Sequence, residues 1–257
     1  KKMSLILDHV NHIYGEDTEL AVTALKDINL VIPDGQFIGL IGHTGSGKST
    51  LVQHLNGLLQ PTGGSIFFNG QDISDNNFNR KELRSKVGLV FQYPEHQLFE
   101  VTVFQDVCFG PKNLGLSQKE VEIRAYNALK QAGVKEEQFY QSPFDLSGGQ
   151  KRRVAIAGVI AMEPEVLILD EPTAGLDPVG REDILSNIES YRQAKNATIM
   201  MVSHSMNDVA KMADRLLVMN DSAVAMFDTP EQVFVHAQEL MDMGLDEQSV
   251  LLGIQTA

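Results

Sequence analysis

Residues 42–50 read Gly42-His43-Thr44-Gly45-Ser46-Gly47-Lys48-Ser49-Thr50 and fit the pattern G-x-x-x-x-G-K-[ST]. The apolar residues 36–41 ahead of them suit a buried strand, and residues 49–58 carry apolar side chains at helical spacing. A glycine-rich loop between a strand and a helix directs backbone N–H groups at a polyphosphate, and the helix N-terminus adds roughly half a positive charge. The alternative is an ordinary glycine-rich turn, but such a turn does not require a strand before it and a helix after it. The pattern therefore predicts a phosphate-binding loop in which Lys48 reaches the β- and γ-phosphates and Ser49 holds Mg²⁺.

The composition is that of a globular protein with a full core. Of 257 residues, 43% are hydrophobic and 21% are charged. The formal net charge of −13 argues against nucleic-acid binding and against a polybasic contact with lipid. The single cysteine, Cys108, excludes an internal disulfide. No apolar run approaches the roughly 18 residues that span a bilayer, so we expect any membrane association to come through a partner, without direct insertion.

Strand patterns alternate with helix patterns along the chain. Predicted strands cover residues 5–10, 24–32, 36–41, 65–68, 87–91, 166–169, 198–202, 215–219 and 223–227, and predicted helices cover 49–58, 117–133, 150–161, 179–192, 206–213 and a tail that starts at Thr229. Such alternation predicts an α/β core with a parallel sheet, in which ligands bind at the carboxyl ends of the strands. Gln92, Asp170 and His204 each follow a predicted strand directly. We therefore expect them to meet the phosphate-binding loop around one phosphate group.

These side chains suit the transfer of a phosphoryl group to water. Asp170, at the end of an apolar strand, suits a contact to Mg²⁺, and the neighbouring Glu171 can accept a proton from the attacking water. A general base of this kind contributes about 10²–10⁴ in rate. His204 can donate to the γ-phosphate and hold the water in line, and Gln92 can bridge the metal and the water. Taken singly, a histidine or a glutamine after a strand is more often a structural residue.

The segment Leu146-Ser147-Gly148-Gly149-Gln150 resembles the signature sequence of ATP-binding cassette (ABC) ATPases. The other motifs of that family stand in the family's order, and the resemblance covers residues 4 to about 227. They are an aromatic A-loop residue (Tyr14), Walker A (42–50), the Q-loop residue (Gln92), the signature, Walker B (166–170) with catalytic Glu171, the D-loop (174–177, with Asp177) and the H-loop residue (His204). The resemblance implies that Tyr14, which could otherwise be a core residue in a polar loop, stacks on adenine.

The family resemblance also implies the architecture. It predicts a P-loop NTPase core with a mostly parallel sheet, an antiparallel β-subdomain, an inserted helical subdomain at about 93–165, and a short C-terminal helical extension. The cassette then covers residues 1–227 and the extension covers 228–257, which is shorter than the extension usual in the family.

The signature sequence implies that two cassettes bind ATP as a pair. Ser147, Gly148, Gly149 and Gln150 open a helix and form a second anion-binding N-terminus. In the family, two cassettes pack head to tail, and each ATP lies between Walker A of one cassette and the signature of the other, with Asp177 at the seam. The basic residues 151–153 near this helix start oppose the helix dipole, so we expect an acidic neighbour to compensate them.

A narrower resemblance lies in residues 91–100, Phe91-Gln92-Tyr93-Pro94-Glu95-His96-Gln97-Leu98-Phe99-Glu100, followed by Phe109-Gly110-Pro111. This is similar to the ATPases of energy-coupling factor (ECF) transporters, which import vitamins or transition-metal ions into prokaryotic cells. It implies a peripheral position on the cytoplasmic face of the membrane. The implied partners are a second ABC ATPase, identical or a paralogue, a transmembrane coupling protein and a membrane substrate-binding subunit. We expect Glu95 and Glu100 to accept an arginine of the coupling helices.

The alternatives are an ATPase subunit of another ABC transporter class, or an ABC ATPase of DNA repair, chromosome structure or translation. Chromosome and repair types insert long coiled coils between Walker A and the signature, and the residues from Lys48 to Leu146 show no sustained heptads. Translation types carry two cassettes and a basic face. A non-enzymatic binding module is expected to lack Glu171 or His204, and both are present.

Overall fold

The computed structural model describes residues 5–256, and the chain divides into two compact units. The first unit contains the residues up to Arg84 and those from Thr198 onward, and the second contains residues 85–197. Residues 1–4 of the predicted cassette and residue 257 of the predicted extension lie outside the described residues. Within residues 5–256, no helix has the length and the hydrophobicity to cross a membrane.

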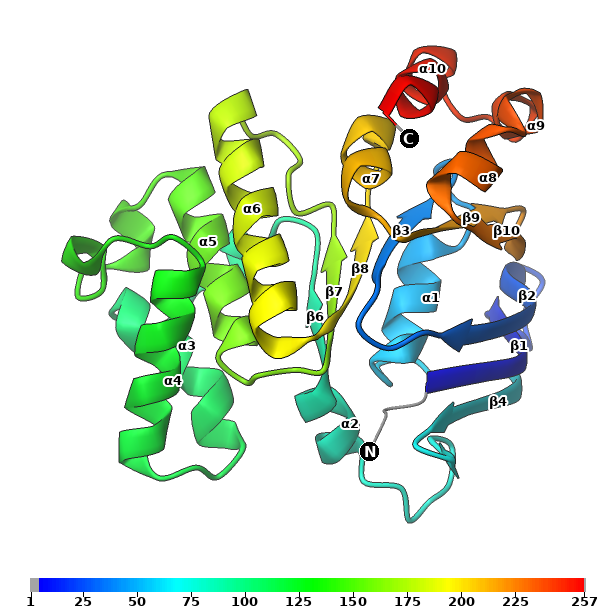
Figure 1. The fold of residues 1–257 in the computed structure, drawn as a ribbon. Coiled ribbons are helices and arrows are strands. Elements are labelled where there is room, and N and C mark those ends of the chain that lie inside the picture. Colours follow the sequence, from blue (N-terminus) through cyan, green and yellow to red (C-terminus); the bar gives the residue numbers. More distant parts are fainter. Residues whose placement is uncertain (1–4, 257) are drawn as a thin grey trace. The chain divides into compact units, whose positions relative to one another are not determined.

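The first unit contains an antiparallel sheet. Its strands are β1 (Leu5–Tyr14), β2 (Val22–Ile32), β4 (Gly63–Phe68) and β5 (Gln71–Asp72), in the order β2-β1-β4-β5 (Figure 1). Inward-facing apolar residues alternate with outward-facing polar ones along β1 and β2, as expected of a sheet with one face on the core. The predicted first strand was too short: β1 continues to Tyr14, which pairs with Val22, because three register shifts let it follow β2 past its polar residues. Tyr14 is therefore a strand residue, not a loop residue.

A second sheet of this unit holds the parallel strands. They are β3 (Phe37–Ile41), β8 (Thr198–Val202) and β9 (Arg215–Asn220), with β10 (Ala223–Asp228) antiparallel at the edge, in the order β10-β9-β3-β8. All residues of β3 and β8 are buried, which explains why these strands read as unbroken apolar runs. The phosphate-binding loop leads from β3 into helix α1 (Lys48–Leu55), and α7 (Met206–Met212) follows β8.

The C-terminal extension forms three short helices of the first unit. They are α8 (Pro230–Phe234), α9 (Ala237–Asp242) and α10 (Glu247–Thr256). Thr229 caps α8 by accepting a hydrogen bond from the Gln232 N–H, as its sequence predicts. Helix α10 packs against α7 and α8 (Figure 1), and a side chain at Gly253 would collide with the Phe234 ring. The extension therefore contributes to the core of this unit.

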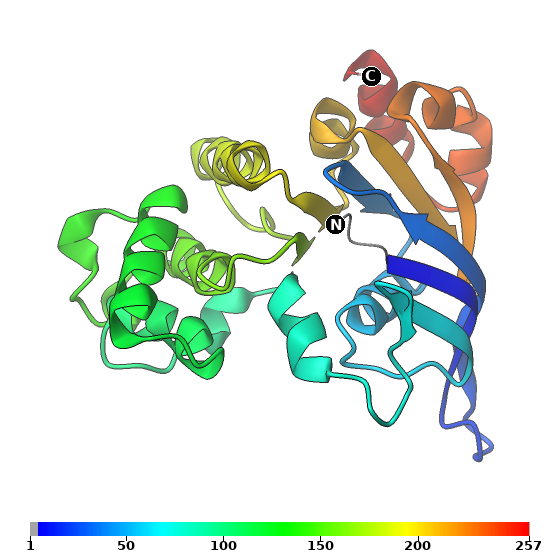
Figure 2. The same ribbon diagram turned by 60° about the horizontal axis from the view of Figure 1, so that its bottom comes forward.

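The second unit consists of a strand pair and a group of helices. Its elements are the parallel strands β6 (Val87–Val90) and β7 (Val166–Asp170) and the helices α3 (Val103–Asn113), α4 (Gln118–Gln131), α5 (Gly148–Ile160) and α6 (Pro178–Lys195). Helix α2 (Arg80–Lys86) crosses the boundary between the units. Helices α3, α4 and α5, green in Figure 2, pack against one another through buried apolar side chains. The predicted combination of a mostly parallel sheet, an antiparallel sheet and a helical insertion is confirmed.

Candidate nucleotide-binding site

The phosphate-binding loop, residues 42–50, has a backbone that only glycine allows at two positions. Gly42 and Gly47 have φ values of 152° and 100°. A Cβ atom at Gly42 would lie 2.3 Å from the Met219 carbonyl oxygen, and one at Gly47 would lie 2.4 Å from the Ala24 carbonyl oxygen. Gly47 also offers no side chain to cap α1, so the first N–H groups of that helix suit an anion. The loop therefore fits the polyphosphate group that its sequence predicts.

Lys48 holds its ammonium group against the loop itself. Its Nζ donates hydrogen bonds to the carbonyl oxygens of Gly42 at 2.7 Å and His43 at 2.8 Å, and the side chain is buried. A buried ammonium in this position supplies positive charge where the loop curves around a phosphate.

Tyr14 lies beside the loop at the end of β1. Its hydroxyl group is 3.2 Å from Oγ1 of Thr50, and its side chain is 43% exposed. The ring of His12 packs edge-on against it, with ring centroids 4.5 Å apart. One aromatic surface thus remains available next to the phosphate-binding loop, as stacking on a nucleotide base requires.

His204 lies at the same edge of the parallel sheet as the phosphate-binding loop. Strands β3 and β8 pair in parallel, with Leu40 opposite Val202, and the Ser203 N–H donates to the Leu40 carbonyl oxygen at 3.3 Å. The phosphate-binding loop follows β3, and His204 follows β8. The His204 side chain is exposed. The first unit therefore brings Tyr14, the loop and His204 to one region.

The second unit gathers the other predicted catalytic side chains. Strands β6 and β7 pair in parallel, with Val90 opposite Leu169. Asp170 ends β7 and Gln92 lies two residues after β6, so both lie at the carboxyl end of this strand pair. Asp170 and Glu171 are buried, whereas Gln92 is exposed. Glu171 has a φ of 52°, a backbone conformation that is uncommon outside glycine and that recurs at functional sites. The meeting of these three residues with the phosphate-binding loop stays a prediction.

The signature segment forms a preorganised helix start. The Ser147 hydroxyl accepts a hydrogen bond from the Gln150 N–H at 3.4 Å, and the Gln150 side chain accepts one from the Ser147 N–H at 2.8 Å. This capping box leaves the Ser147 hydroxyl proton available to an acceptor. A Cβ atom at Gly148 would meet nothing within 4 Å, so a ligand can approach the N–H groups that open α5.

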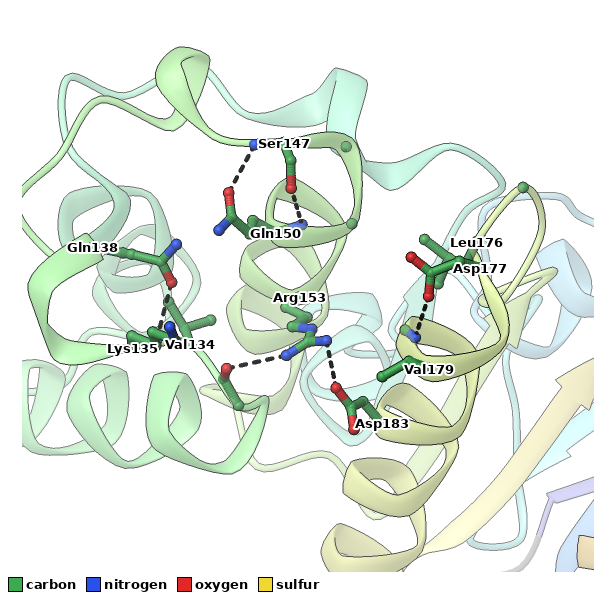
Figure 3. Close-up of a pocket in the computed structure, with 15 residues that line it drawn as sticks. Val134, Lys135, Gln138, Ser147, Gln150, Arg153, Leu176, Asp177, Val179 and Asp183 are labelled. Carbon is green, nitrogen blue, oxygen red and sulfur yellow. Dashed lines mark hydrogen bonds and ion pairs between the residues drawn. The ribbon is translucent and has the colours of Figure 1, made fainter.

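A cavity of about 560 Å³ lies in front of this helix start (Figure 3). Its walls come from the signature, the D-loop, the first turns of α6 and the segment before η2 (Glu136–Gln138). Asp177 caps α6 by accepting the Gly180 N–H at 2.7 Å. Arg153 points into the same region and pairs with Asp183 at 2.9 Å (Figure 3). The predicted signature and D-loop residues therefore share one cavity with residues that no sequence motif marks, among them Lys135 and Asp183.

The basic residues of α5 have acidic neighbours, as predicted. Arg152 is paired with Glu95 at 3.0 Å, and both side chains are largely buried, with 4% and 14% exposed. The guanidinium group also donates to the carbonyl oxygens of Pro172, which directly follows Glu171, and Ala174, the first residue of the D-loop. Glu95 was expected to accept an arginine from a partner, but the structure gives it an arginine of its own chain. That expectation is wrong for Glu95 because its carboxylate is already enclosed.

Comparison with known proteins places this geometry in a family. Residues 25–174 match the family model described as "ABC transporter". The energy-coupling factor transporter ATP-binding protein EcfA2 of Clostridioides difficile is 55% identical over 251 residues, which cover 97% of this chain and 87% of that protein. The protein of the same name from Caldanaerobacter subterraneus is 54% identical over 243 residues, covering 95% and 85% of the two chains.

Two solved structures are similar as well. The structure of cbiO1 from Clostridium perfringens has a TM-score of 0.81 and 38% identity, and covers 97% of this chain and 96% of that one. A dimeric ATP-binding cassette in a post-hydrolysis state, bound to ADP and Pi, has a TM-score of 0.77 and 30% identity, with 88% and 98% covered. This chain therefore belongs to the ABC transporter family and, within it, to the ATP-binding proteins of energy-coupling factor transporters, which hydrolyse ATP as part of a transporter.

Proposed function

We propose that this chain powers the import of a vitamin or a transition-metal ion from a peripheral position on the cytoplasmic face of a prokaryotic cell membrane. Its partners there are a transmembrane coupling protein and a membrane substrate-binding subunit, and the latter selects the substrate. The names of the EcfA2 relatives support this assignment. So does the cbiO1 structure, described as part of the ABC transporter complex cbiONQ.

The chain works as half of a dimer, with an identical copy or a paralogue. Each ATP lies between the phosphate-binding loop of one subunit and the signature of the other. The observation that carries this proposal is the signature helix start: Ser147 and Gln150 hold each other in a capping box, and Gly148 leaves the N–H groups open to a ligand. An anion site of this kind in the second unit has no nucleotide loop of its own, so it suits the phosphates that a second subunit brings.

Within that dimer each predicted residue has a distinct role. Bound Mg²⁺ neutralises phosphate charge, and Ser49, Asp170 and Gln92 offer the oxygen atoms that such a hard cation prefers. Glu171 takes the proton of the attacking water, and His204 holds that water against the γ-phosphate. Lys48 and the loop N–H groups bind the phosphates, and Tyr14 stacks on the base.

Exposed apolar side chains of the second unit form the docking site that we assign to the coupling protein. Its members are large side chains between residues 93 and 144, each at least 44% exposed: Tyr93, Phe99, Val101, Phe109, Tyr140 and Phe144. The rings of Phe99 and Phe109 pack edge-on with centroids 5.0 Å apart. Exposed apolar side chains with an acidic neighbour, as Phe99 and Val101 have in Glu100, suit an amphipathic helix with a basic residue.

A charge reversal tests the docking site. We expect Glu100→Arg to lower co-purification with the membrane subunits, because it sets like charges against each other, and to leave ATP affinity unchanged. Glu231→Arg, a reversal at an exposed position of α8, serves as the matched control. Equal recovery of the membrane subunits with both variants would contradict this surface.

Removal of the proposed base tests the ATPase mechanism. Glu171→Gln should retain MgATP, lose about 10²–10⁴-fold in turnover, and accumulate as a dimer in light scattering, alone or with its partner ATPase. Glu231→Gln should behave as the wild type. A Glu171→Gln variant that binds MgATP and remains monomeric with either partner, or a wild-type monomer with full ATPase activity, would refute the shared site.

A further inference from the structure

Two buried histidines lie behind Tyr14. His12, in β1, and His54, in α1, are both buried, and His54 has no exposed surface at all. Their rings pack edge-on with centroids 4.6 Å apart, and the other side of His12 meets the Tyr14 ring at 4.5 Å. The three rings form a continuous row from the body of α1 to the exposed face of Tyr14.

The hydrogen bonds fix the tautomer of both rings. Nδ1 of His12 lies 3.1 Å from the Gln60 carbonyl oxygen, and Nδ1 of His54 lies 2.8 Å from the Thr50 carbonyl oxygen. A carbonyl oxygen only accepts, so Nδ1 carries the proton in both rings. Each Nε2 then holds a lone pair, and neither has a hydrogen-bond partner within residues 5–256. Apolar side chains would fill this space without burying two unsatisfied acceptors, so stability alone does not explain the pair.

The row of rings is connected to the phosphate-binding loop at its other end. The Tyr14 hydroxyl meets the Thr50 hydroxyl at 3.2 Å, and the Thr50 carbonyl oxygen accepts the His54 Nδ1 proton. Tyr14 is thus held at two points, at its ring by His12 and at its hydroxyl by Thr50, and both contacts lead to His54. One edge-on ring contact and one hydrogen bond restrain the Tyr14 ring directly, and His54 supports the partner of each through its own ring contact and hydrogen bond.

We propose that His12 and His54 are positioning residues that hold the Tyr14 ring in the plane on which the nucleotide base stacks. This inference rests on the proposed function, which gives Tyr14 its stacking role. Both histidines are buried, so a nucleotide reaches them only through Tyr14, and they act on the base contact alone. Loss of the pair should weaken binding of ATP, raise KM and leave kcat at saturation unchanged, because stacking acts equally on the ground state and the transition state.

The test compares two ligands on the full-length chain. MgATP carries a base, whereas inorganic tripolyphosphate with Mg²⁺ reaches only the phosphate-binding loop. Calorimetric titration of both ligands is made for the wild type, His54→Leu, His12→Leu, Tyr14→Leu and the double variant Tyr14→Leu/His54→Leu. Val233→Ala, a core truncation in α8, is the matched control for a general loss of stability. Binding of tripolyphosphate reports that each variant has folded.

The expected results separate positioning from structure. Tyr14→Leu should raise the Kd for MgATP by about 5- to 150-fold, the range of one stacking contact, and leave the Kd for tripolyphosphate unchanged. His54→Leu and His12→Leu should raise the Kd for MgATP in the same selective way, by about 5-fold or more. The double variant should bind as Tyr14→Leu does, because the histidines act only through that ring. His54→Phe keeps an aromatic edge against His12 but loses the hydrogen bond to the Thr50 carbonyl oxygen, so it should recover part of the MgATP affinity that His54→Leu loses.

Three results would overturn the inference. One is an unchanged Kd for MgATP in both histidine variants while Tyr14→Leu is weakened. Another is additive weakening in the double variant. The third is an equal loss for both ligands, which would show a structural role. If Tyr14→Leu itself binds MgATP normally, the stacking role in the proposed function fails, and the two failures are thereby distinguished.

Discussion

Replacement of Arg152 by leucine should destabilise the second unit by about 3–5 kcal/mol, the usual cost of leaving one partner of a buried ion pair unpaired. The contacts of Arg152 explain why the expected loss of stability is this large. Arg152 donates to both carboxylate oxygens of Glu95, at 3.2 Å and 3.0 Å, and only 4% of its side chain is exposed. Without it, the enclosed Glu95 carboxylate and two carbonyl oxygens lose their donor. Domains are stable by only about 5–15 kcal/mol, so the loss is a large fraction of the total.

A double-mutant cycle in urea measures the ion pair itself. Arg152→Leu, Glu95→Leu and the double variant are unfolded with circular dichroism as the readout. The double variant should be more stable than the sum of the two losses predicts, by about 1–3 kcal/mol, because it leaves no charge unpaired. Arg153→Leu is the internal control: its pair with Asp183 is 24% and 51% exposed and should be worth about 0–1 kcal/mol. Strictly additive losses at Arg152 and Glu95, or equal losses at Arg152 and Arg153, would refute the reasoning.

Three further predictions concern the first unit. Lys48→Ala should weaken MgATP binding by about 10- to 150-fold, since it removes charge-assisted bonds worth about 1.5–3 kcal/mol, and calorimetry that shows unchanged affinity would contradict the loop assignment. Gly47→Ala should lower both stability and nucleotide affinity, because the new Cβ would lie 2.4 Å from the Ala24 carbonyl oxygen at a φ of 100°; a variant with the wild-type unfolding midpoint would show that the loop can relax. Burial holds the pKa of His54 below its ordinary value of 6.5, so the unfolded chain binds a proton there before the folded chain does, and this contribution to stability falls as the pH drops below 6.5. Urea unfolding at about pH 7.5 and about pH 5.5 should therefore show a smaller loss in His54→Leu than in the wild type, and equal losses would contradict the assignment.

The sequence was sufficient for features set by local pattern. Unbroken apolar runs identified β7 and β8, and the Thr229 cap placed the start of α8, because each depends on residues only a few positions apart. The capping box at Ser147 and Gln150 is local in the same way. The loop, the signature and the D-loop could thus be located from motifs alone.

Contacts between distant segments could not be predicted in this way. Glu95 looked like an acceptor for a partner because it follows Gln92 in an acidic and aromatic stretch, yet its ion pair comes from Arg152, far along the chain. The pairing of His12 with His54 likewise depends on how β1 and α1 pack. Strand β1 extends to Tyr14 because its register against β2 shifts. The pattern of apolar and polar residues along β1 alone does not show such shifts.

The same packing explains how the second unit can hold Glu171 in a conformation that its own sequence disfavours. Glu171 has a φ of 52°, and a residue held in such a region costs of the order of 1–3 kcal/mol. The chain that follows is tied down at once, since Arg152 binds the carbonyl oxygens of Pro172 and Ala174 and Asp177 caps α6. Because Arg152 also belongs to the signature helix and binds Glu95, one guanidinium group fixes the loop after Gln92, the signature and the residues beside Glu171 together. Displacement of any one of these three segments would therefore strain the contacts that Arg152 makes with the other two.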